Sequence, residues 1–123
     1  MKKVVAIFGS PRVNGNSDIL LNQAIKGAEA SGAKVEKIVI RDLQIAPCNA
    51  CDGCFEKGTC VIYDDVQQIY SHLVDADGII VASPVYFMSV SAQLKAFIDR
   101  CQPFWAKKYI LHLPVRKGMG SAN

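Results

Sequence analysis

The sequence has few of the features that would place a protein in a membrane, on a nucleic acid or outside the cell. Its apolar runs are only a few residues long, far short of the roughly 20 residues that span a bilayer. The first run stops at Phe8, before Gly9 and Ser10, so it is also too short for a secretory signal. Lysine and arginine are scattered without a run of like charge, and the net charge is only +3. We therefore expect a cytosolic protein with no nucleic-acid or membrane partner.

Residue sets that are typical of hydrolases are also missing. The chain contains no nucleophile elbow, no paired carboxylates and no histidine-rich metal motif. A redox cofactor requires no such set, because the protein only has to hold the cofactor and tune it. Half of the residues are hydrophobic and a fifth are charged, which is typical of globular proteins, and 123 residues suffice for one domain (residues 1–123).

Short β-branched runs alternate with segments of helical periodicity along the chain. We predict strands over residues 2–8, 33–40, 78–83 and 108–113, and helices over residues 17–30, 66–74 and 90–100. Asn16 or Ser17 is the expected N-cap of the first helix. This alternation predicts an α/β fold with a doubly wound parallel sheet, whose ligand lies beyond the carboxyl ends of the strands.

Residues 9–17, GSPRVNGNS, join the first predicted strand to the first predicted helix. Backbone N–H groups and a helix amino terminus converge in such a loop and favour an anion. Ser10, Asn16 and Ser17 add polar donors, and the guanidinium of Arg12 suits phosphate oxygens. The dinucleotide fingerprint and the Walker lysine signature are absent, so we expect a mononucleotide phosphate. The alternative is a polar turn that only caps the helix.

Residues 83–89, SPVYFMS, leave the third predicted strand at the same edge of the sheet. Their main chain is expected to meet the edge of a flat ring, with Tyr86 or Phe87 packed beside it. The alternative is that both aromatic side chains fill the core.

Four of the five cysteines lie within thirteen positions, in the loop of residues 48–60. Cys48, Cys51, Cys54 and Cys60 have the spacing C-x2-C-x2-C-x5-C. In a reducing compartment such a cluster indicates a metal site more often than disulfides. Three cysteines in one tight run favour a four-iron four-sulfur cluster, and free redox-active thiols or a zinc ion are the alternatives. Cys101 lies apart and is interpreted as a structural thiol.

Together, GSPRVNGNS, APCNACDGCFEKGTCVIYDD and DADGIIVASPVYFMSVSAQLKAFIDR closely resemble the iron-sulfur flavoproteins of the NADPH-dependent FMN reductase family, over about residues 3–100. The resemblance implies a three-layer flavodoxin-like fold with strand order 2-1-3-4-5 and a noncovalently bound FMN. It assigns the FMN phosphate to Ser10, Arg12, Asn16 and Ser17, the border of the isoalloxazine to Pro84, Val85, Tyr86 and Phe87, and the cluster to Cys48, Cys51, Cys54 and Cys60.

The resemblance also implies a function and partners. We expect an oxidoreductase that passes electrons between a [4Fe-4S] cluster and FMN, because a cluster carries single electrons and a flavin holds one or two. A ferredoxin-like protein or NAD(P)H is the expected donor, and a dimer or tetramer is the expected assembly. The alternatives are an NAD(P)H-dependent FMN or quinone reductase without a cluster, and a non-enzymatic module with free thiols or structural zinc.

The resemblance ends near residue 100. Family members continue past the fourth strand, whereas this sequence ends with YILHLPVRKGMGSAN, of which YILHL belongs to the fourth predicted strand. We therefore expect a sheet truncated after its fourth strand, with an apolar face that is either buried in an oligomer or left bare in a weakly stable domain.

Overall fold

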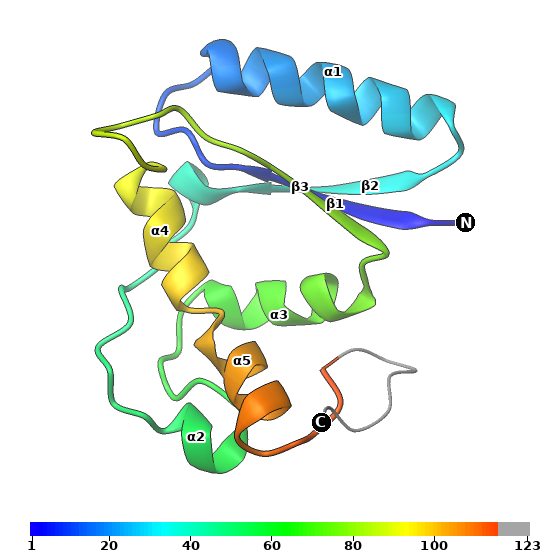
Figure 1. Ribbon diagram of the computed structural model, residues 1–123. Helices are drawn as coiled ribbons and strands as arrows, with labels where there is room; N and C mark the ends of the chain where they lie inside the picture. The colour runs from blue at the N-terminus through cyan, green and yellow to red at the C-terminus, as the bar shows by residue number, and fades with distance from the viewer. Residues whose placement is uncertain (116–123) are drawn as a thin grey trace.

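A three-stranded parallel sheet lies between helices in the computed structural model, which describes residues 1–115 (Figure 1). The elements in chain order are β1 (Lys3–Phe8), α1 (Asn16–Ala30), β2 (Lys34–Val39), the 3-10 turn η1 (Ile40–Asp42), α2 (Cys54–Lys57), α3 (Val66–Asp75), β3 (Gly78–Ala82), α4 (Ala92–Asp99) and α5 (Gln102–Tyr109). The three predicted strands up to residue 83 and the three predicted helices are confirmed. None of the described helices is long and apolar enough to cross a membrane.

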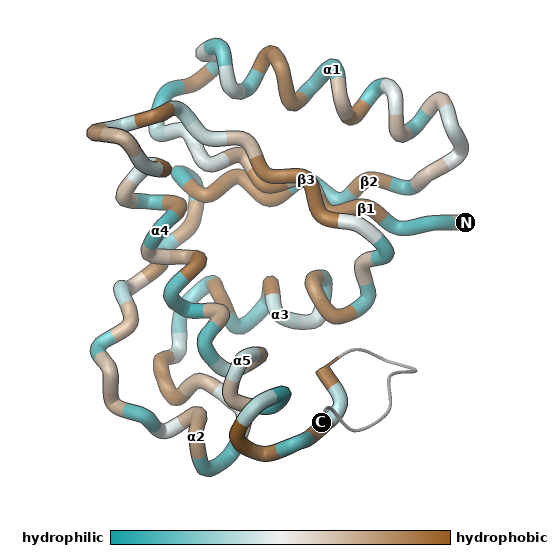
Figure 2. The backbone as a smooth tube through the Cα atoms, in the orientation of Figure 1, coloured by the Kyte–Doolittle hydropathy of each residue, from teal (hydrophilic) through white to brown (hydrophobic). Residues whose placement is uncertain are grey.

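The sheet has the order β2-β1-β3, and both neighbours run parallel to β1. Val4 of the central strand pairs with Val35 of β2 and with Gly78 of β3. The last four residues of β1 are buried, because helices cover both faces of a central parallel strand. Apolar residues of the strands are visible as brown stretches in the middle of the molecule (Figure 2).

Two apolar cores lie on opposite faces of the sheet. Helix α1 covers one face, and α3 and α4 lie on the other (Figure 1). The first core contains Ala6, Phe8, Leu21 and Ile25, and the second contains Val5, Ile7, Ile38, Ile40, Val66, Ile69, Ala76, Leu94 and Phe97. Alternate residues of β1 enter different cores, which is the period expected of a strand buried on both sides.

The prediction of a fourth strand over residues 108–113 is wrong. Helix α5 extends to Tyr109, and the N–H of Ile110 still donates to the carbonyl of Ala106 at 3.0 Å. Pro103 and Ala106 are buried and lie three residues apart, as on one face of a helix. A short apolar run does not by itself distinguish a strand from a helix. The predicted order 2-1-3-4-5 is therefore confirmed for its first three strands, and no strand of residues 1–115 lies beyond β3.

The carboxyl ends of β1 and β3 are joined tightly at Gly9. The N–H of Gly9 donates to Ala82 O at 2.8 Å, and its carbonyl accepts a hydrogen bond from the hydroxyl of Ser91 at 2.5 Å. Ser91 is fully buried and caps α4 by accepting from the N–H of Leu94 at 3.1 Å. This junction fixes the start of the loop of residues 9–15 against the start of α4.

Substitution of Gly9 by alanine is expected to destabilise the protein by about 1 to 3 kcal/mol, the usual cost of overpacking. A Cβ at this position would lie 2.8 Å from both Ala82 O and Leu94 Cδ2. The control is Gly27→Ala, because a Cβ there meets no atom within 4 Å and alanine favours the helix. Denaturant unfolding should show a lower free energy of unfolding for Gly9→Ala and no decrease for Gly27→Ala. Equal stability of the two variants would contradict this packing.

Candidate functional site

The loop between β1 and α1 leaves the amino terminus of α1 without a side-chain cap in the described residues. The helix begins at Asn16, and its N-cap is Gly15, with φ −78° and ψ −175°. The predicted N-cap at Asn16 or Ser17 is wrong, because both residues already belong to the helix. The first-turn N–H groups and the positive end of the helix dipole are therefore not satisfied by a capping side chain, as an anion site requires.

An ion pair that the sequence did not reveal holds this loop. Asp18, in the first turn of α1, is 3% exposed, and its Oδ2 lies 3.0 Å from Nη2 of Arg41. Arg41 Nη1 also donates to the carbonyls of Ser10 and Arg12, both at 3.1 Å. The N–H of Asn14, which has a left-handed φ of 56°, donates to Asp18 Oδ2 at 3.0 Å. Arg41 neutralises the carboxylate, so Asp18 repels a bound anion less.

The four residues assigned to the phosphate lie on this one loop and the first helical turn. Ser10 is buried, and its Oγ accepts a hydrogen bond from the N–H of Arg12 at 3.1 Å. The side chains of Arg12 and Asn16 are exposed and Ser17 is partly buried. The arrangement suits an anion that enters from solvent, and Ser10 contributes by shaping the loop.

The aromatic segment after β3 forms an exposed turn. Phe87 and Met88 both have positive φ, 44° and 68°, and the backbones of Tyr86 and Ser89 pair across the turn. Phe87 is 98% exposed, and Val85 and Tyr86 are also exposed, whereas Pro84 is partly buried. These aromatic side chains do not fill the core, which was the alternative interpretation. The turn and the loop of residues 9–15 leave neighbouring strands at the same edge of the sheet (Figure 1).

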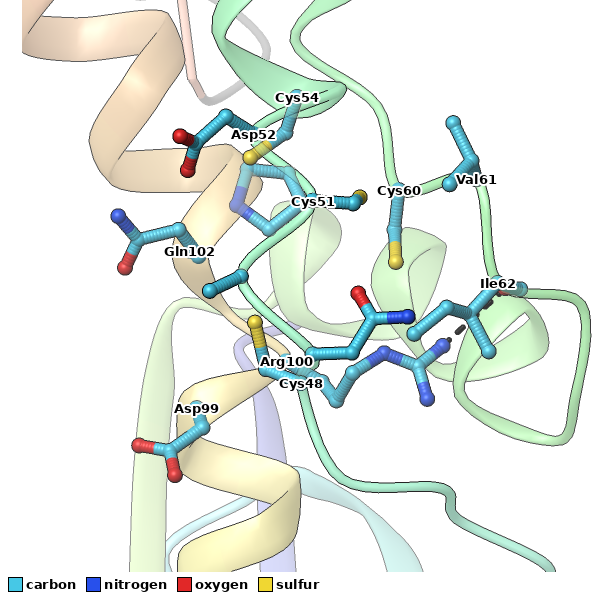
Figure 3. Close-up of a pocket in the computed structure, with 13 residues that line it drawn as sticks. Cys48, Cys51, Asp52, Cys54, Cys60, Val61, Ile62, Asp99, Arg100 and Gln102 are labelled. Atoms are coloured by element: carbon cyan, nitrogen blue, oxygen red, sulfur yellow. Dashed lines mark hydrogen bonds between the residues drawn. The ribbon is translucent and has the colours of Figure 1, made fainter.

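All four clustered cysteines line one cavity of about 320 Å³ (Figure 3). The cavity lies at the carboxyl end of α4, where Asp99 and Arg100 line it, whereas the loop of residues 9–15 meets the start of this helix. We call this cavity the cysteine pocket. Its other lining residues are Asn49, Ala50, Asp52, Val61, Ile62, Asp99, Arg100, Gln102 and Pro103. All five cysteines of the described chain are free thiols. The four cysteines assigned to the cluster therefore line one pocket, and their role as ligands stays a prediction.

The thiols of the cysteine pocket influence one another. Burial raises the pKa of Cys54, and negative charge on Cys48, Cys51 and Cys60 raises it further, while a backbone hydrogen bond opposes the rise. Bringing four thiolates together is therefore unfavourable until a positive group binds them. No three histidine, cysteine, aspartate or glutamate side chains among residues 1–115 are arranged to hold a metal ion. A single zinc ion would need all four sulfurs at about 2.3 Å from one centre, whereas an iron-sulfur cluster binds each thiolate through a different iron and needs a wider arrangement.

Two aspartates at the start of α3 close the base of the cysteine loop. Asp64 Oδ2 accepts from the N–H of Ala46 at 2.8 Å, and Asp65 Oδ2 accepts from the N–H of Gln44 at 2.6 Å. Arg100 forms an ion pair with Asp64, with 2.6 Å between Nη1 and Oδ2. Burial alone would raise the pKa of Asp64, but its hydrogen bonds to Arg100 and to backbone N–H groups lower it overall. The chain entering the loop and the chain leaving it are thus fixed side by side.

Cys101 is separate from this cluster and behaves as a structural thiol. Its side chain packs against the second core, and its Sγ donates to the carbonyl of Phe97 at 3.6 Å. Burial raises the pKa of Cys101 to about 11, although the neighbouring Arg100 lowers it. The thiol is therefore protonated and unreactive near neutral pH.

Comparison with known proteins identifies the family. The sequence profile of the NADPH-dependent FMN reductase family matches residues 2–123. The chain is 46% identical over 101 residues to an iron-sulfur flavoprotein of Methanocaldococcus jannaschii, a match that covers 82% of this chain and 52% of the relative. It is 39% identical over 109 residues to an iron-sulfur flavoprotein of Methanosarcina thermophila, covering 89% of this chain and 57% of the relative. The chain thus spans about half the length of the curated relatives it matches.

Solved structures also resemble this chain in fold. The apo form of an NADH:FMN oxidoreductase superposes with a TM-score of 0.65 at 28% identity, over 88% of this chain and 54% of that one. An azoreductase from Bacillus anthracis superposes with a TM-score of 0.66, over 82% of this chain and 55% of that one, and at 17% identity it supports the fold alone. With the profile match over nearly every residue and several relatives above 38% identity, the chain belongs to the NADPH-dependent FMN reductase family of flavin oxidoreductases.

Proposed function

We propose that this protein is an iron-sulfur flavoprotein in which FMN and a four-iron four-sulfur cluster exchange electrons. The observation that carries the proposal is that one short helix, α4, connects the two candidate sites. Its N-cap, Ser91, donates a hydrogen bond to Gly9 at the start of the loop of residues 9–15. At its other end, Asp99 and Arg100 line the cysteine pocket. Eight helical residues at a rise of 1.5 Å make this connection about 12 Å long.

The donor set of the cysteine pocket fits an iron-sulfur cluster. Four thiols from one loop line the same cavity, which is the ligand type and number that such clusters require. Several relatives are named iron-sulfur flavoproteins. When bound, the cluster supplies one-electron chemistry, and FMN supplies chemistry with one or two electrons. Cys48, Cys51, Cys54 and Cys60 would hold the cluster.

The loop of residues 9–17 fits the phosphate of FMN. Its N–H groups lie at an uncapped helix amino terminus, Arg12 and Asn16 are accessible, and the Asp18–Arg41 pair holds the loop in place without a ligand. In the proposal, Ser10, Arg12, Asn16 and Ser17 bind the phosphate. The exposed turn of Pro84, Val85, Tyr86 and Phe87 borders the isoalloxazine and shields one edge of the ring from water.

Electron exchange between the two groups is testable directly. The full chain is loaded anaerobically with FMN, ferrous iron and sulfide, and then titrated with dithionite while absorption and electron paramagnetic resonance are recorded. We expect both the flavin and the iron signals to change, and to re-equilibrate after partial reduction. A protein in which only the flavin is reduced would favour the alternative of a plain NAD(P)H-dependent FMN or quinone reductase. Absence of both signals would favour a non-enzymatic module.

We further propose a donor and an assembly. Either a ferredoxin-like protein or NAD(P)H supplies the electrons, and stopped-flow mixing with each donor would identify which one reduces the flavin at a useful rate. An apolar groove beside β3 is lined by Ile79 and Val81, which are 51% and 49% exposed, together with Phe104. We propose that a second copy covers this groove in a dimer or tetramer. Light scattering after size-exclusion chromatography tests this, and a stable monomer would contradict it.

Substitution of Arg12 by alanine is expected to weaken FMN binding by about 1 to 3 kcal/mol, because a charge-assisted hydrogen bond to phosphate is lost. The control is Lys26→Ala, which removes another exposed cation, from the later part of α1 and away from the loop of residues 9–15. Quenching of FMN fluorescence on titration gives the dissociation constants. An affinity for FMN that is equal in wild type and Arg12→Ala would place Arg12 outside the phosphate site.

A further inference from the structure

Arg100 is a buried cation that the phosphate and cysteine assignments leave without a role. It follows α4 directly, its relative accessibility is 0%, and it lines the cysteine pocket. Among the residues that line this pocket it is the only cation. A guanidinium out of water is unfavourable unless opposite charges and acceptors surround it. The question is which groups compensate this one.

Four of the five N–H donors of Arg100 are hydrogen-bonded, to Asp64 and to backbone carbonyls on either side of the cysteine loop. Nη1 and Nη2 bind the two carboxylate oxygens of Asp64 at 2.6 and 3.0 Å, a two-point pair that only a planar guanidinium forms. Nη1 also donates to Ala46 O at 2.8 Å. Nη2 donates to Ile62 O at 3.1 Å, a bond that is drawn as a dashed line in Figure 3. These contacts hold the two ends of the cysteine loop and leave the guanidinium one orientation.

The fifth donor has no such partner. Nε of Arg100 is buried and makes no hydrogen bond within the described residues. Buried polar groups are nearly always paired, so an orphaned donor in a pocket indicates a group that binds there. The chemistry beside this donor is that of thiols, because the four clustered cysteines line the same pocket as Arg100.

We propose that Arg100 is the charge-compensating residue of the four-cysteine site, and that its Nε–H donates to a sulfur of the bound cluster. This inference rests on the proposed function, because it requires the cluster. Four thiolates give the site negative charge, and each electron that enters adds one more unit. A fixed cation beside them stabilises the reduced form more than the oxidised form, and a hydrogen bond to sulfur acts in the same direction. Arg100 thus makes the site easier to reduce.

Reduction potentials of charge variants test this role. The full chain and its variants are reconstituted anaerobically with ferrous iron and sulfide, and dithionite supplies single electrons while the iron signal is followed by electron paramagnetic resonance. In Arg100→Gln we expect the reduction equilibrium to shift at least tenfold toward the oxidised form, which for one electron is a fall in midpoint of about 59 mV. Arg100→Lys keeps the charge and should recover most of this shift, although it loses the two-point pair and stability.

A substitution that should shift the midpoint potential in the opposite direction separates an effect of charge from an effect of structure. Asp64→Asn keeps an oxygen acceptor but removes the negative charge that offsets Arg100, so its midpoint should rise. A purely structural role predicts no such reversal, because both substitutions weaken the same ion pair. If Arg100→Gln binds no iron, the Asp64→Asn midpoint decides: a rise supports the proposal, and an unchanged or lower value overturns it.

The remaining outcomes are also distinct. A midpoint that is the same in wild type and Arg100→Gln, or that falls equally in Arg100→Lys, overturns the role of Arg100 while the proposed function stands. Iron uptake by the wild type and by none of the three variants would make the ion pair a structural element alone, which also overturns it. A wild type that takes up no iron overturns the proposed cluster, and this inference with it.

Discussion

Substitution of Cys51 by serine is expected to abolish stoichiometric iron binding and to leave the fold intact. Cys51 is exposed in the apoprotein and belongs to the loop that lines the cysteine pocket, outside both apolar cores. The serine hydroxyl stays protonated near neutral pH and is a poor ligand for iron, so a site built for four thiolates loses one. Iron analysis after anaerobic reconstitution measures the loss, and circular dichroism during denaturant unfolding measures the stability.

The matched control is Cys101→Ser. This cysteine lies outside the pocket and packs beside the second core, so its substitution should leave the iron content unchanged. Wild-type iron stoichiometry in Cys51→Ser would remove the cluster assignment. An equal loss of iron in both variants would show that the loss follows from damage to the fold and not from a missing ligand.

Substitution of Asp64 by alanine is expected to destabilise the apoprotein by about 3 to 5 kcal/mol, the cost of leaving a buried charge without its partner. Asp64 is the only carboxylate that the described residues place against Arg100 in an ion pair, and it also holds the N–H groups of Ala46 and Val66. The control is Asp65→Ala, which removes one backbone hydrogen bond, to Gln44, and should cost about 1 kcal/mol. Equal losses in the two variants, measured by denaturant unfolding, would contradict the importance of the buried pair.

The same pair predicts how stability depends on pH. The pKa of Asp64 is lower in the folded protein than in the unfolded chain, where it is near 4. Its contribution is therefore fully present above about pH 4 to 5 and is lost as the pH falls through the folded pKa. Asp64→Ala should flatten this part of the stability profile of the apoprotein. A profile below pH 5 with the same slope in wild type and variant would contradict the lowered pKa.

The sequence predicted the first three strands and helices α1, α3 and α4 correctly, because their signals are local. β1 and α1 follow from a buried β-branched run and from helical spacing within a few residues. The prediction failed over residues 108–113, where a short apolar run fits a strand as well as the end of α5. It also misplaced the N-cap of α1 by one or two residues, because Asn and Ser are the commoner caps and Gly15 takes this place.

The contacts that hold the two candidate sites are not local, and the sequence did not predict them. Arg41 lies 23 positions from Asp18, and Arg100 lies 36 positions from Asp64. No periodicity or motif connects residues so far apart, and a lone arginine in a helical segment is more often solvated than buried. From the sequence alone, Asp64 is only a favourable negative charge before α3. Its partner becomes evident once the fold places the end of α4 against the cysteine loop.

The content of cofactors per chain tests the central claim most directly. The full chain is purified anaerobically, or reconstituted with FMN, ferrous iron and sulfide, and its absorption spectrum, iron, sulfide and FMN are measured. We predict one FMN and one four-iron four-sulfur cluster per chain, visible as flavin bands on a broad iron-sulfur shoulder. Flavin bands without iron, or a colourless protein that takes up neither group, would contradict the account.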